Sequence, residues 1–493
     1  ISGFPEWLPS ERVVEQRVID TLRNVFELNG FIGIETRAVE QGSSLLKKGE
    51  TSKEIYLLSR LQEVGHESDT PIEDRLGLHF DLTVPLSRYV VEHSGDLAFP
   101  FKRWQIQKVW RGERPQEGRF REFVQADIDV IGNGDLPDHY EVELPLVMVS
   151  ALERLREFGL PKATVHANNR KLSEGFYRGL GLTDIEGVLR EIDKLDKIGA
   201  DEVAKLLVEG CGADEAQARA CLELAELTAA DGKELSDKFD ALCAKHDIAS
   251  DSDAYVLARQ GLDTLAMIVD EAARIRPGSV IADLKIARGL DYYTGSVYET
   301  FLDGAAALGS ICSGGRYDNL ASQGNKKYPG VGLSIGLSRL VSYMLHTAGA
   351  HANRVSPASV LVAVWNEADR SASNLIANQL SPIYFYNAGT IMKKESLVKG
   401  EFCSTQIFVL VDKGFVKESL ITPIPASTYL CIYCNSFDKE KEYIGRLLEE
   451  IREKRYRITG DYICEVVAEV PMDMQERGMF LRLQIPVSLR GNA

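Results

Sequence analysis

The stretch RGERPQEGRFREFVQADIDVIG, residues 111–132, decides the fold of this 493-residue chain. Its second half alternates as a β-strand does, so successive side chains point to opposite faces of a sheet. One face carries the apolar Val124, Ala126, Ile128 and Val130. The other carries Arg121, Phe123, Gln125, Asp127 and Asp129. This mixture of cation, ring, amide and carboxylates favours the floor of a polar cleft in an antiparallel sheet, with an ordinary solvated face as the alternative.

The first half of the same stretch is an arginine-rich loop between two predicted strands within residues 101–132. It holds Arg111, Arg114, Arg119 and Arg121. Guanidinium groups bind phosphate through paired hydrogen bonds and stay charged. The whole chain has a formal net charge of -16, so it has no general attraction for phosphate backbones. The local cluster predicts a bound polyanion, and a charged surface loop is the alternative.

A second polar element is HFDLTVPLSRY, residues 79–89. We interpret its beginning as a strand, with Asp81 and Thr83 on one face and Leu82 and Val84 on the other. A carboxylate beside a hydroxyl could hold an ammonium group. A capped strand end explains the same residues.

Three glycine-containing segments complete the polar set. IARGLDYYTGSVYE (286–299) brings Arg288 next to Gly289, where a ligand can approach the backbone, and continues with Tyr292 and Tyr293. SGGRYDNL (313–320) is interpreted as a glycine-rich turn. GVGLSIGLSRL (330–340) leaves room for a flat group on its small-residue face and places Arg339 in the first turn of a helix. A dinucleotide-binding fold is excluded because no acidic residue follows in a strand–helix–strand context.

The bulk properties indicate a globular protein of two to four domains, with 44% hydrophobic and 26% charged residues. The eight cysteines are scattered, so we expect reduced core thiols and no metal site, the pair Cys431 and Cys434 included. No apolar run long enough to span a membrane and no signal peptide is recognisable, so a cytoplasmic location is expected.

Composition divides the chain into five expected parts. These are a core in two parts (1–170 and 256–350), a helical insertion domain (171–255), a linker with the start of a further domain (351–380), and a last α/β domain (381–493).

The motifs resemble those of class II aminoacyl-tRNA synthetases in their histidyl form. RGERPQEGRFREFVQADIDV is similar to the second class II motif and GVGLSIGLSRL to the third. ARGLDYYTG and SGGRYDNL resemble the two signatures of the histidyl enzymes. The resemblance covers about residues 3–380. It implies an α+β fold with a six-stranded antiparallel sheet, flanking helices and a helical insertion, and a homodimer joined through the catalytic domains.

The resemblance also implies an ATP site. Arg111 would bind the α-phosphate and the reacting carboxylate, and Glu113 would contact adenine. Phe123 and Arg339 would stack on the two faces of the adenine, with Arg339 reaching the γ-phosphate. Mg²⁺ would bridge the phosphates.

For histidine, the resemblance implies that Asp81, Thr83 and Asp129 hold the α-ammonium group, with Gln125 nearby. Tyr292 and Tyr293 would line the imidazole pocket. Arg288 would neutralise charge that develops on the α-phosphate, so Arg288 and Arg111 are the expected catalytic residues.

The third implied substrate is tRNA(His). Its acceptor stem would be contacted by Arg114, Arg119 and Arg121.

From about residue 381 the chain resembles another family, the effector-binding (gyrase-inhibitor-like) domain of multidrug-sensing transcription regulators. The segments AGTIMKKESLVKG (388–400) and YIGRLLEEIREKRYRITGDYICEVV (443–467) carry this likeness. It implies a pocket for lipophilic cations around a carboxylate, for which Glu465 is the candidate; an outward-facing strand glutamate is the alternative. The two resemblances meet near Leu380, which suggests a rearranged or engineered chain with only the first strand and helix of an anticodon-binding domain.

Two other functions fit parts of the pattern. One is a non-catalytic, synthetase-like regulator of histidine biosynthesis, which the presence of Arg111, Arg288 and Arg339 disfavours. The other is a ligand-binding module whose function resides in the C-terminal part.

Overall fold

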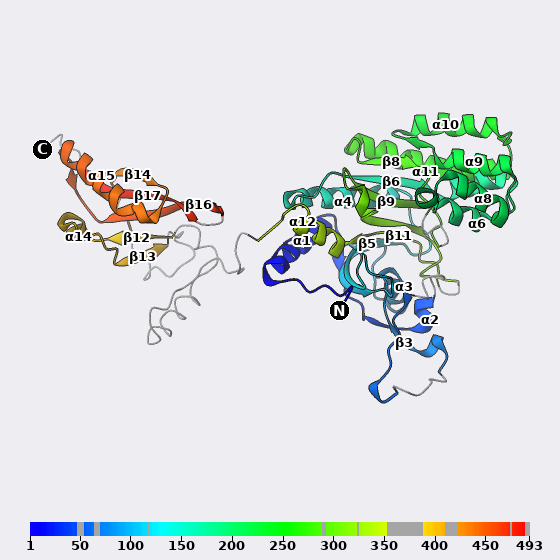
Figure 1. Ribbon diagram of the computed structural model, residues 1–493, viewed down its shortest axis with the longest axis horizontal. Coiled ribbons are helices and arrows are strands. Elements are labelled where there is room, and N and C mark those ends of the chain that lie inside the picture. Colours follow the sequence, from blue (N-terminus) through cyan, green and yellow to red (C-terminus); the bar gives the residue numbers. More distant parts are fainter. Residues whose placement is uncertain are drawn as a thin grey trace. The chain divides into compact units, whose positions relative to one another are not determined.

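The structure is a computed structural model with two compact units, Ile1–Ala352 and Asn353–Ala493, each described by itself (Figure 1). It describes residues 1–46, 54–63, 70–116, 118–287, 292–322, 325–352, 388–409, 423–424, 426–473 and 476–488. The predicted remnant strand and helix before Leu380 lie outside these residues.

A mixed sheet of nine strands forms the centre of the first unit, in the order β1-β4-β5-β11-β10-β9-β6-β8-β7. The strands from β4 to β6 in this order are antiparallel to their neighbours, whereas β1 joins β4 and β8 joins β6 in parallel. The bounds are β1 Ile32–Gly33, β4 Phe101–Trp110, β5 Glu122–Ile131, β6 Ala163–Asn169, β7 Thr228–Ala229, β8 Val280–Asp283, β9 Ser296–Leu302, β10 Cys312–Tyr317 and β11 Gly330–Gly336. An antiparallel sheet is therefore confirmed at the centre, and its edges add parallel pairs.

One rung of this sheet is polar across six strands. Residues in register on neighbouring strands share a face. The rung runs from β4 to β6 through Gln105, Asp127, Ser334, Ser313, Glu299 and His166. The polar face predicted for β5 therefore continues over most of the sheet.

The opposite face is apolar and covered by helices α1 (Pro9–Leu28), α4 (His139–Arg154) and α12 (Leu337–His346) (Figure 1). Leu22, Met148 and Leu340 from these helices share a core with Ile128 and Val130 of β5. Each such side chain contributes about 2 kcal/mol when fully buried, so this face stabilises the sheet. The predicted helix over about 337–346 is confirmed.

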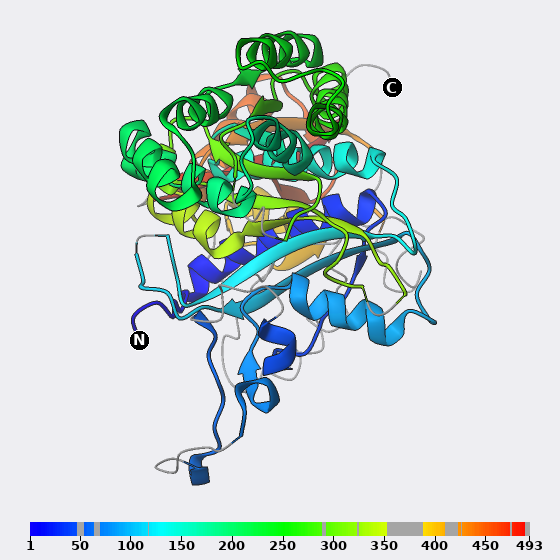
Figure 2. The same cartoon turned by 90° about the vertical axis from the view of Figure 1, so that its right-hand side faces the viewer.

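Helices gather at one end of the unit, in the region predicted as a helical insertion (Figures 1 and 2). They are α5 Arg170–Gly179, α6 Ile185–Ile192, α7 Leu195–Ile198, α8 Ala200–Cys211, α9 Glu215–Ala225, α10 Gly232–Lys245 and α11 Asp253–Ile275. The strand β7 also lies within this region and pairs with β8 of the main sheet. The domain boundaries stay predictions.

The strand predicted near residues 78–85 is wrong beyond its start. Strand β3 covers Leu76–Leu78 and pairs with β2 (Val39–Gln41), and helix α3 begins at Thr83 and ends at His93. The Asp81 carboxylate accepts a hydrogen bond from the Val84 backbone N–H at 3.0 Å, as a helix-capping side chain does. Leu82, Leu86 and Val90 are fully buried at helical spacing, a periodicity that the short alternating window concealed. The short α2 (Gly42–Leu45) completes this region.

SGGRY is a strand in the middle of the sheet rather than a turn. A Cβ atom at Gly314 would lie 2.0 Å from the Gly332 carbonyl oxygen, and one at Gly315 would lie 2.5 Å from that of Ser296. The glycines therefore allow close strand packing, and the turn prediction failed because tertiary crowding is invisible in the sequence. Likewise, the room predicted at Gly332 is filled, because a Cβ there would meet the Asp129 carboxylate at 1.9 Å.

The second unit contains an antiparallel sheet with the order β13-β12-β16-β17-β14, and β15 pairs with β17. Its elements are β12 Ala388–Met392, α14 Lys394–Lys399, β13 Gln406–Val409, β14 Thr428–Cys434, α15 Glu440–Glu453, β15 Arg457–Ile458, β16 Tyr462–Asp473 and β17 Glu476–Ser488. Leu397 of α14 and Ile444 and Leu447 of α15 pack on Leu481 and Leu483 of β17. The long helix and the two closing strands predicted here are confirmed.

In the described parts of the chain, the helices are all too short or too polar to cross a membrane.

Candidate active site

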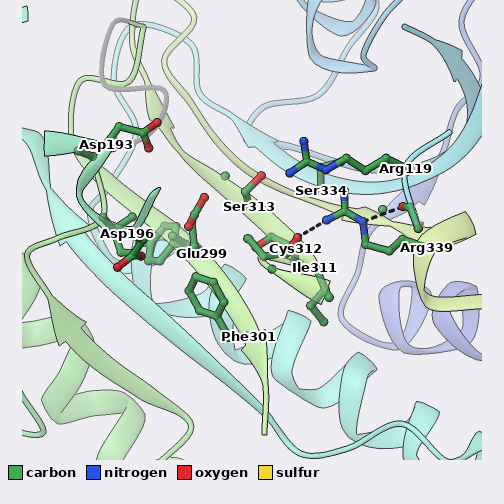
Figure 3. A pocket seen from close by; sticks show the side chains of 18 of the residues that line it. Arg119, Asp193, Asp196, Glu299, Phe301, Ile311, Cys312, Ser313, Ser334 and Arg339 are labelled. Atoms are coloured by element: carbon green, nitrogen blue, oxygen red, sulfur yellow. Dashed lines mark hydrogen bonds between the residues drawn. The ribbon is translucent and has the colours of Figure 1, made fainter. Parts of the chain in front are cut away.

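A cavity of about 520 Å³ lies over the polar face of the main sheet (Figure 3). Arg111, Phe123 and Gln125 line it from β5 and the loop before it, and Ser334 and Arg339 from β11 and α12. Segments more than 200 residues apart in the sequence therefore meet at one site.

Arg111 stands at the end of β4 and is oriented by a backbone oxygen. Its Nε donates to the Phe80 carbonyl at 3.0 Å, and its guanidinium lies 5.2 Å from the Phe123 ring centroid. A Glu113 carboxylate oxygen is 3.9 Å from Nη1. The neutral carbonyl fixes the direction of the cation without neutralising its charge, which suits an anionic ligand.

Arg339 approaches the same cavity from the first turn of α12 (Figure 3). Its Nε donates to the Gly118 carbonyl at 3.0 Å and its Nη1 to the Ser310 carbonyl at 2.7 Å. Gly118 has a φ of +68°, so the turn that presents this carbonyl favours glycine. The predicted convergence of Arg111 and Arg339 is thus present.

The third predicted cation, Arg288, lies outside the described residues. The nearest described residues on either side of it in the sequence, Ala287 and Tyr292, line the cavity, as does Tyr293. The two tyrosine rings are 4.1 Å apart, and burial raises the pKa of Tyr293 well above its usual value. Tyr293 is therefore a neutral phenol that can donate or accept a hydrogen bond.

A buried cluster of charge lies on the same face of β4 and β5 as Gln125. Arg103 is fully buried, with Nη2 2.7 Å from Asp129 and 3.8 Å from Asp127. Burial raises the pKa of Asp127 to about 7; Asp129 and Asp81 add to the rise, while Arg103 and a hydrogen bond from Ser334 oppose it. Two carboxyl groups share one guanidinium and Asp81 adds a third nearby, so this region is poor in positive charge and suits a cationic ligand group.

The predicted histidine contacts Asp81, Thr83 and Asp129 do not line the cavity. Asp129 is held by Arg103 and by the Tyr317 hydroxyl, which donates to it at 2.5 Å. Asp81 caps α3, as described above. Gln125, the fourth residue of this set, does line the cavity.

The predicted tRNA-contact arginines separate in the structure. Arg119 lines the cavity beside Arg339 (Figure 3). Arg121 instead donates from Nε to the Glu113 carbonyl at 3.1 Å, which shapes the loop. Arg114 is exposed and does not line the cavity.

Several lining residues were not predicted from the sequence. Glu299 of β9 faces the cavity although it is 7% exposed, and Lys285 and Asp196 form an ion pair of 3.1 Å at its edge. Asp193 joins them from the helical region (Figure 3). A glutamate at an inward position of the strand SVYETFL was a usable signal, whereas the contact of residues 193–196 with this cavity required the fold.

The predicted absence of a metal cluster is not tested by a structure without ions. Among the residues that the structure describes, His, Cys, Asp and Glu do not gather in groups of three or more suited to a metal ion. Cys434 is buried and Cys431 exposed, and both are free thiols.

Glu465 of β16 is buried and paired in the second unit. Arg482 donates to its Oε2 from Nε at 3.1 Å and from Nη2 at 2.5 Å, and Gln484 donates at 3.1 Å. The carboxylate is therefore paired with a cation and an amide of the same sheet.

Comparison with known proteins agrees with this geometry. The family described as Histidyl-tRNA synthetase matches residues 3–340. The Histidine--tRNA ligase of Bifidobacterium longum subsp. infantis is 91% identical over 380 residues, 77% of this chain and 82% of that protein. The Histidine--tRNA ligase of Cutibacterium acnes is 52% identical over 381 residues, again 77% and 82%.

A solved structure supports the same assignment. The histidyl-tRNA synthetase from Nostoc sp. PCC 7120 superimposes with a TM-score of 0.64 at 35% identity, over 77% of this chain and 82% of that one. Together with the cavity that Arg111 and Arg339 share, these matches lead to one conclusion: the chain belongs to the histidyl-tRNA synthetase family.

Proposed function

We infer that this chain activates histidine with ATP to form histidyl-adenylate and then transfers the histidyl group to tRNA(His). The observation that carries this inference is the pair Arg111 and Arg339, two arginines fixed by carbonyl oxygens on one cavity. Adenylation brings a carboxylate against an anionic phosphate, so fixed cations must stabilise the charge of the transition state.

For ATP, Arg111 binds the α-phosphate and the attacking carboxylate in this proposal. Glu113 contacts the adenine, and Phe123 and Arg339 stack on its two faces. Support comes from the position of all four residues on the cavity wall. Arg288 acts with Arg111 on the α-phosphate, as the sequence motif implies.

Mg²⁺ enters with ATP in this proposal and reduces the charge of its phosphates. The carboxylates on the cavity wall include Glu113 and Glu299. Asp193 and Asp196 line it as well, but among the described residues such side chains do not gather in groups of three or more suited to a metal ion, which fits an ion held mainly by substrate phosphates and water.

For histidine, Gln125 accepts a hydrogen bond from the α-ammonium group, and Tyr292 and Tyr293 line the imidazole pocket. Asp81 and Asp129 act through the field of the buried cluster. Thr83 contacts the α-ammonium group in this proposal, a role that rests on the motif alone.

For tRNA(His), Arg119 is the best-placed contact of the acceptor end, with Arg114 and Arg121 further along the loop. We also propose a homodimer in the cytoplasm. The region around β2 and β3 projects from the unit and exposes the apolar Leu57, Leu61 and Ile72 (Figure 2). In the proposed dimer these side chains are buried against the second copy.

Histidine-dependent exchange of pyrophosphate into ATP tests the first step. The wild-type chain should show it, and Arg288→Ala should abolish most of it. No exchange with a folded wild-type chain would favour the regulator of histidine biosynthesis, an alternative that the two fixed arginines and the 91% identical ligase disfavour.

We propose separately that the second unit is an effector-binding-like domain for lipophilic cations. Its antiparallel sheet covered on one face by α14 and α15 supports this, as does the stacked pair Tyr433 and Phe480, 5.3 Å apart beside Arg482. A cation would have to displace Arg482 from Glu465. Quenching of the intrinsic fluorescence by rhodamine 6G, lost in Glu465→Gln, tests the idea.

A further inference from the structure

The side-chain amide of Gln125 has one end that is hydrogen-bonded and one end that is not. Gln125 is 7% exposed and lines the cavity, and its Nε2 donates to the Ser334 hydroxyl at 2.7 Å. Its Oε1 is buried and has no hydrogen-bond partner among the residues that the structure describes. An unpaired buried amide oxygen costs about 1–3 kcal/mol, so a ligand donor is expected there.

The neighbouring glutamines cannot supply that donor. Gln107 stands opposite Gln125 across β4 and β5, but its Nε2 donates to the Thr36 carbonyl at 2.8 Å. The Gln107 Oε1 in turn accepts from Gln105 at 2.6 Å. Both ends of the Gln107 amide are therefore engaged away from Gln125.

The amide of a glutamine can turn over, so something must decide which end faces the cavity. Ser334 lies opposite Asp127 in the register of β5 and β11, and Asp127 Oδ1 is buried without a hydrogen-bond partner among the described residues, so the Ser334 hydroxyl is placed to donate to this carboxyl. A hydroxyl that donates to a carboxylate can only accept from its other neighbour. That neighbour is Gln125, which must then present N–H to Ser334 and oxygen to the cavity.

We propose that Asp127 and Ser334 are positioning residues that orient the Gln125 amide, so that the site selects the α-ammonium group of histidine. The hydrogen bonds run from Gln125 through Ser334 to Asp127, and the Arg103 guanidinium lies 3.8 Å from the Asp127 carboxylate. Neither Asp127 nor Ser334 was expected to act on the substrate. This inference rests on the proposed binding of histidine at Gln125.

The test uses Ser334→Ala and Asp127→Asn in the full chain. The alanine removes the hydroxyl that accepts from the Gln125 amide. The asparagine can donate to Ser334 and so reverse the direction of the hydrogen bonds. Each should raise the KM for histidine by about 10- to 100-fold, the effect of losing an oriented hydrogen bond to a charged group. The KM for ATP should change less than about twofold, and Ser338→Ala is the control. Ser338 is also a buried serine, in the first turn of α12, but its hydroxyl accepts from the Val124 N–H of β5 at 2.9 Å rather than from Gln125.

Two ligands separate orientation from general damage to the pocket. Histidinol keeps the ammonium group and lacks the carboxylate, whereas 3-(imidazol-4-yl)propionate lacks the ammonium group. Both variants should weaken the binding of histidinol by the same factor as that of histidine, and they should leave the binding of 3-(imidazol-4-yl)propionate unchanged. Equal weakening of both ligands would overturn the proposal.

A double-mutant cycle tests whether Ser334 acts through Gln125. In a Gln125→Ala background, Ser334→Ala should change the KM for histidine less than about twofold. An undiminished effect there would show that Ser334 does not act through Gln125. Thermal melts exclude misfolding, and absence of exchange in the wild-type chain would instead refute the proposed function.

Discussion

Each of the two units has a sheet with an apolar face under helices and a polar face opposite. The arginines on the two polar faces differ in the groups that hold them. On the first sheet, Arg111 and Arg339 are anchored by the carbonyls of Phe80, Gly118 and Ser310. On the second, Arg482 is held by the carboxylate of Glu465. Carbonyl oxygens orient the first two arginines on the wall of a cavity, with Glu113 3.9 Å from Arg111, whereas two hydrogen bonds to one carboxylate orient Arg482 within its own sheet.

The largest expected effect tests this contrast directly. Arg111→Ala should lower kcat/KM for histidine-dependent exchange about 1000-fold, because one preorganised group that stabilises transition-state charge is lost. Arg482→Ala, its counterpart on the second sheet, should leave exchange within about twofold. Equal losses in both variants would remove the distinction between the two arginines.

The next effect concerns stability. Arg103→Ala should lower the free energy of unfolding by about 3 kcal/mol or more, because it leaves carboxylates buried without their cation. Arg482 is 37% exposed in its side chain, and its pair with Glu465 should be worth less than about 1 kcal/mol. Urea denaturation of both variants, followed by fluorescence, measures the difference.

A smaller effect should appear in the pH dependence of stability. Because burial raises the pKa of Asp127 from 3.8 to about 7, the folded state binds a proton that the unfolded state has released. This contribution is fully present below about pH 4 and is lost as the pH rises to about 7. The free energy of unfolding of Asp127→Asn, relative to that of the wild type, should therefore rise by at most about 2.7 kcal/mol between pH 5 and pH 7.

Matched denaturation curves at the two pH values check this gain. A stability difference between Asp127→Asn and the wild type that is the same at both would mean that Asp127 titrates normally in the folded protein.

The smallest effect is expected at Glu465. Glu465→Gln should reduce stability by less than about 1 kcal/mol, while any binding of rhodamine 6G should fall at least tenfold. Fluorescence titration decides the second point. Binding that survives the substitution would place the ligand elsewhere or exclude the effector-binding proposal.

The sequence predicted those parts of the fold whose signals are local. The alternation of residues 122–131 predicted β5 and its two faces, and the pattern before Arg339 predicted β11 and α12. The motifs also predicted that Arg111 and Arg339 would share a site. In each case the period or the motif lies within one continuous segment.

The failures all depend on contacts between distant segments. The glycines of β10 were interpreted as a turn because the carbonyls that crowd them belong to other strands. The contacts of Asp129 with Arg103 and Tyr317 were likewise not predicted, because they become visible only when β4, β5 and β10 are side by side. Residues 193–196 gave no signal at all, since only the fold brings them to the cavity.

The pairing of β5 with β11 also has a consequence for synthesis of the chain on the ribosome. Ile131 is paired with Gly330, so about 200 residues must be translated before the second edge of β5 finds its partner. At about 5–20 residues per second this takes roughly 10–40 s. The β4–β5 hairpin must spend that interval with an unsatisfied edge, at the stage when a nascent chain is most exposed to aggregation and to chaperones.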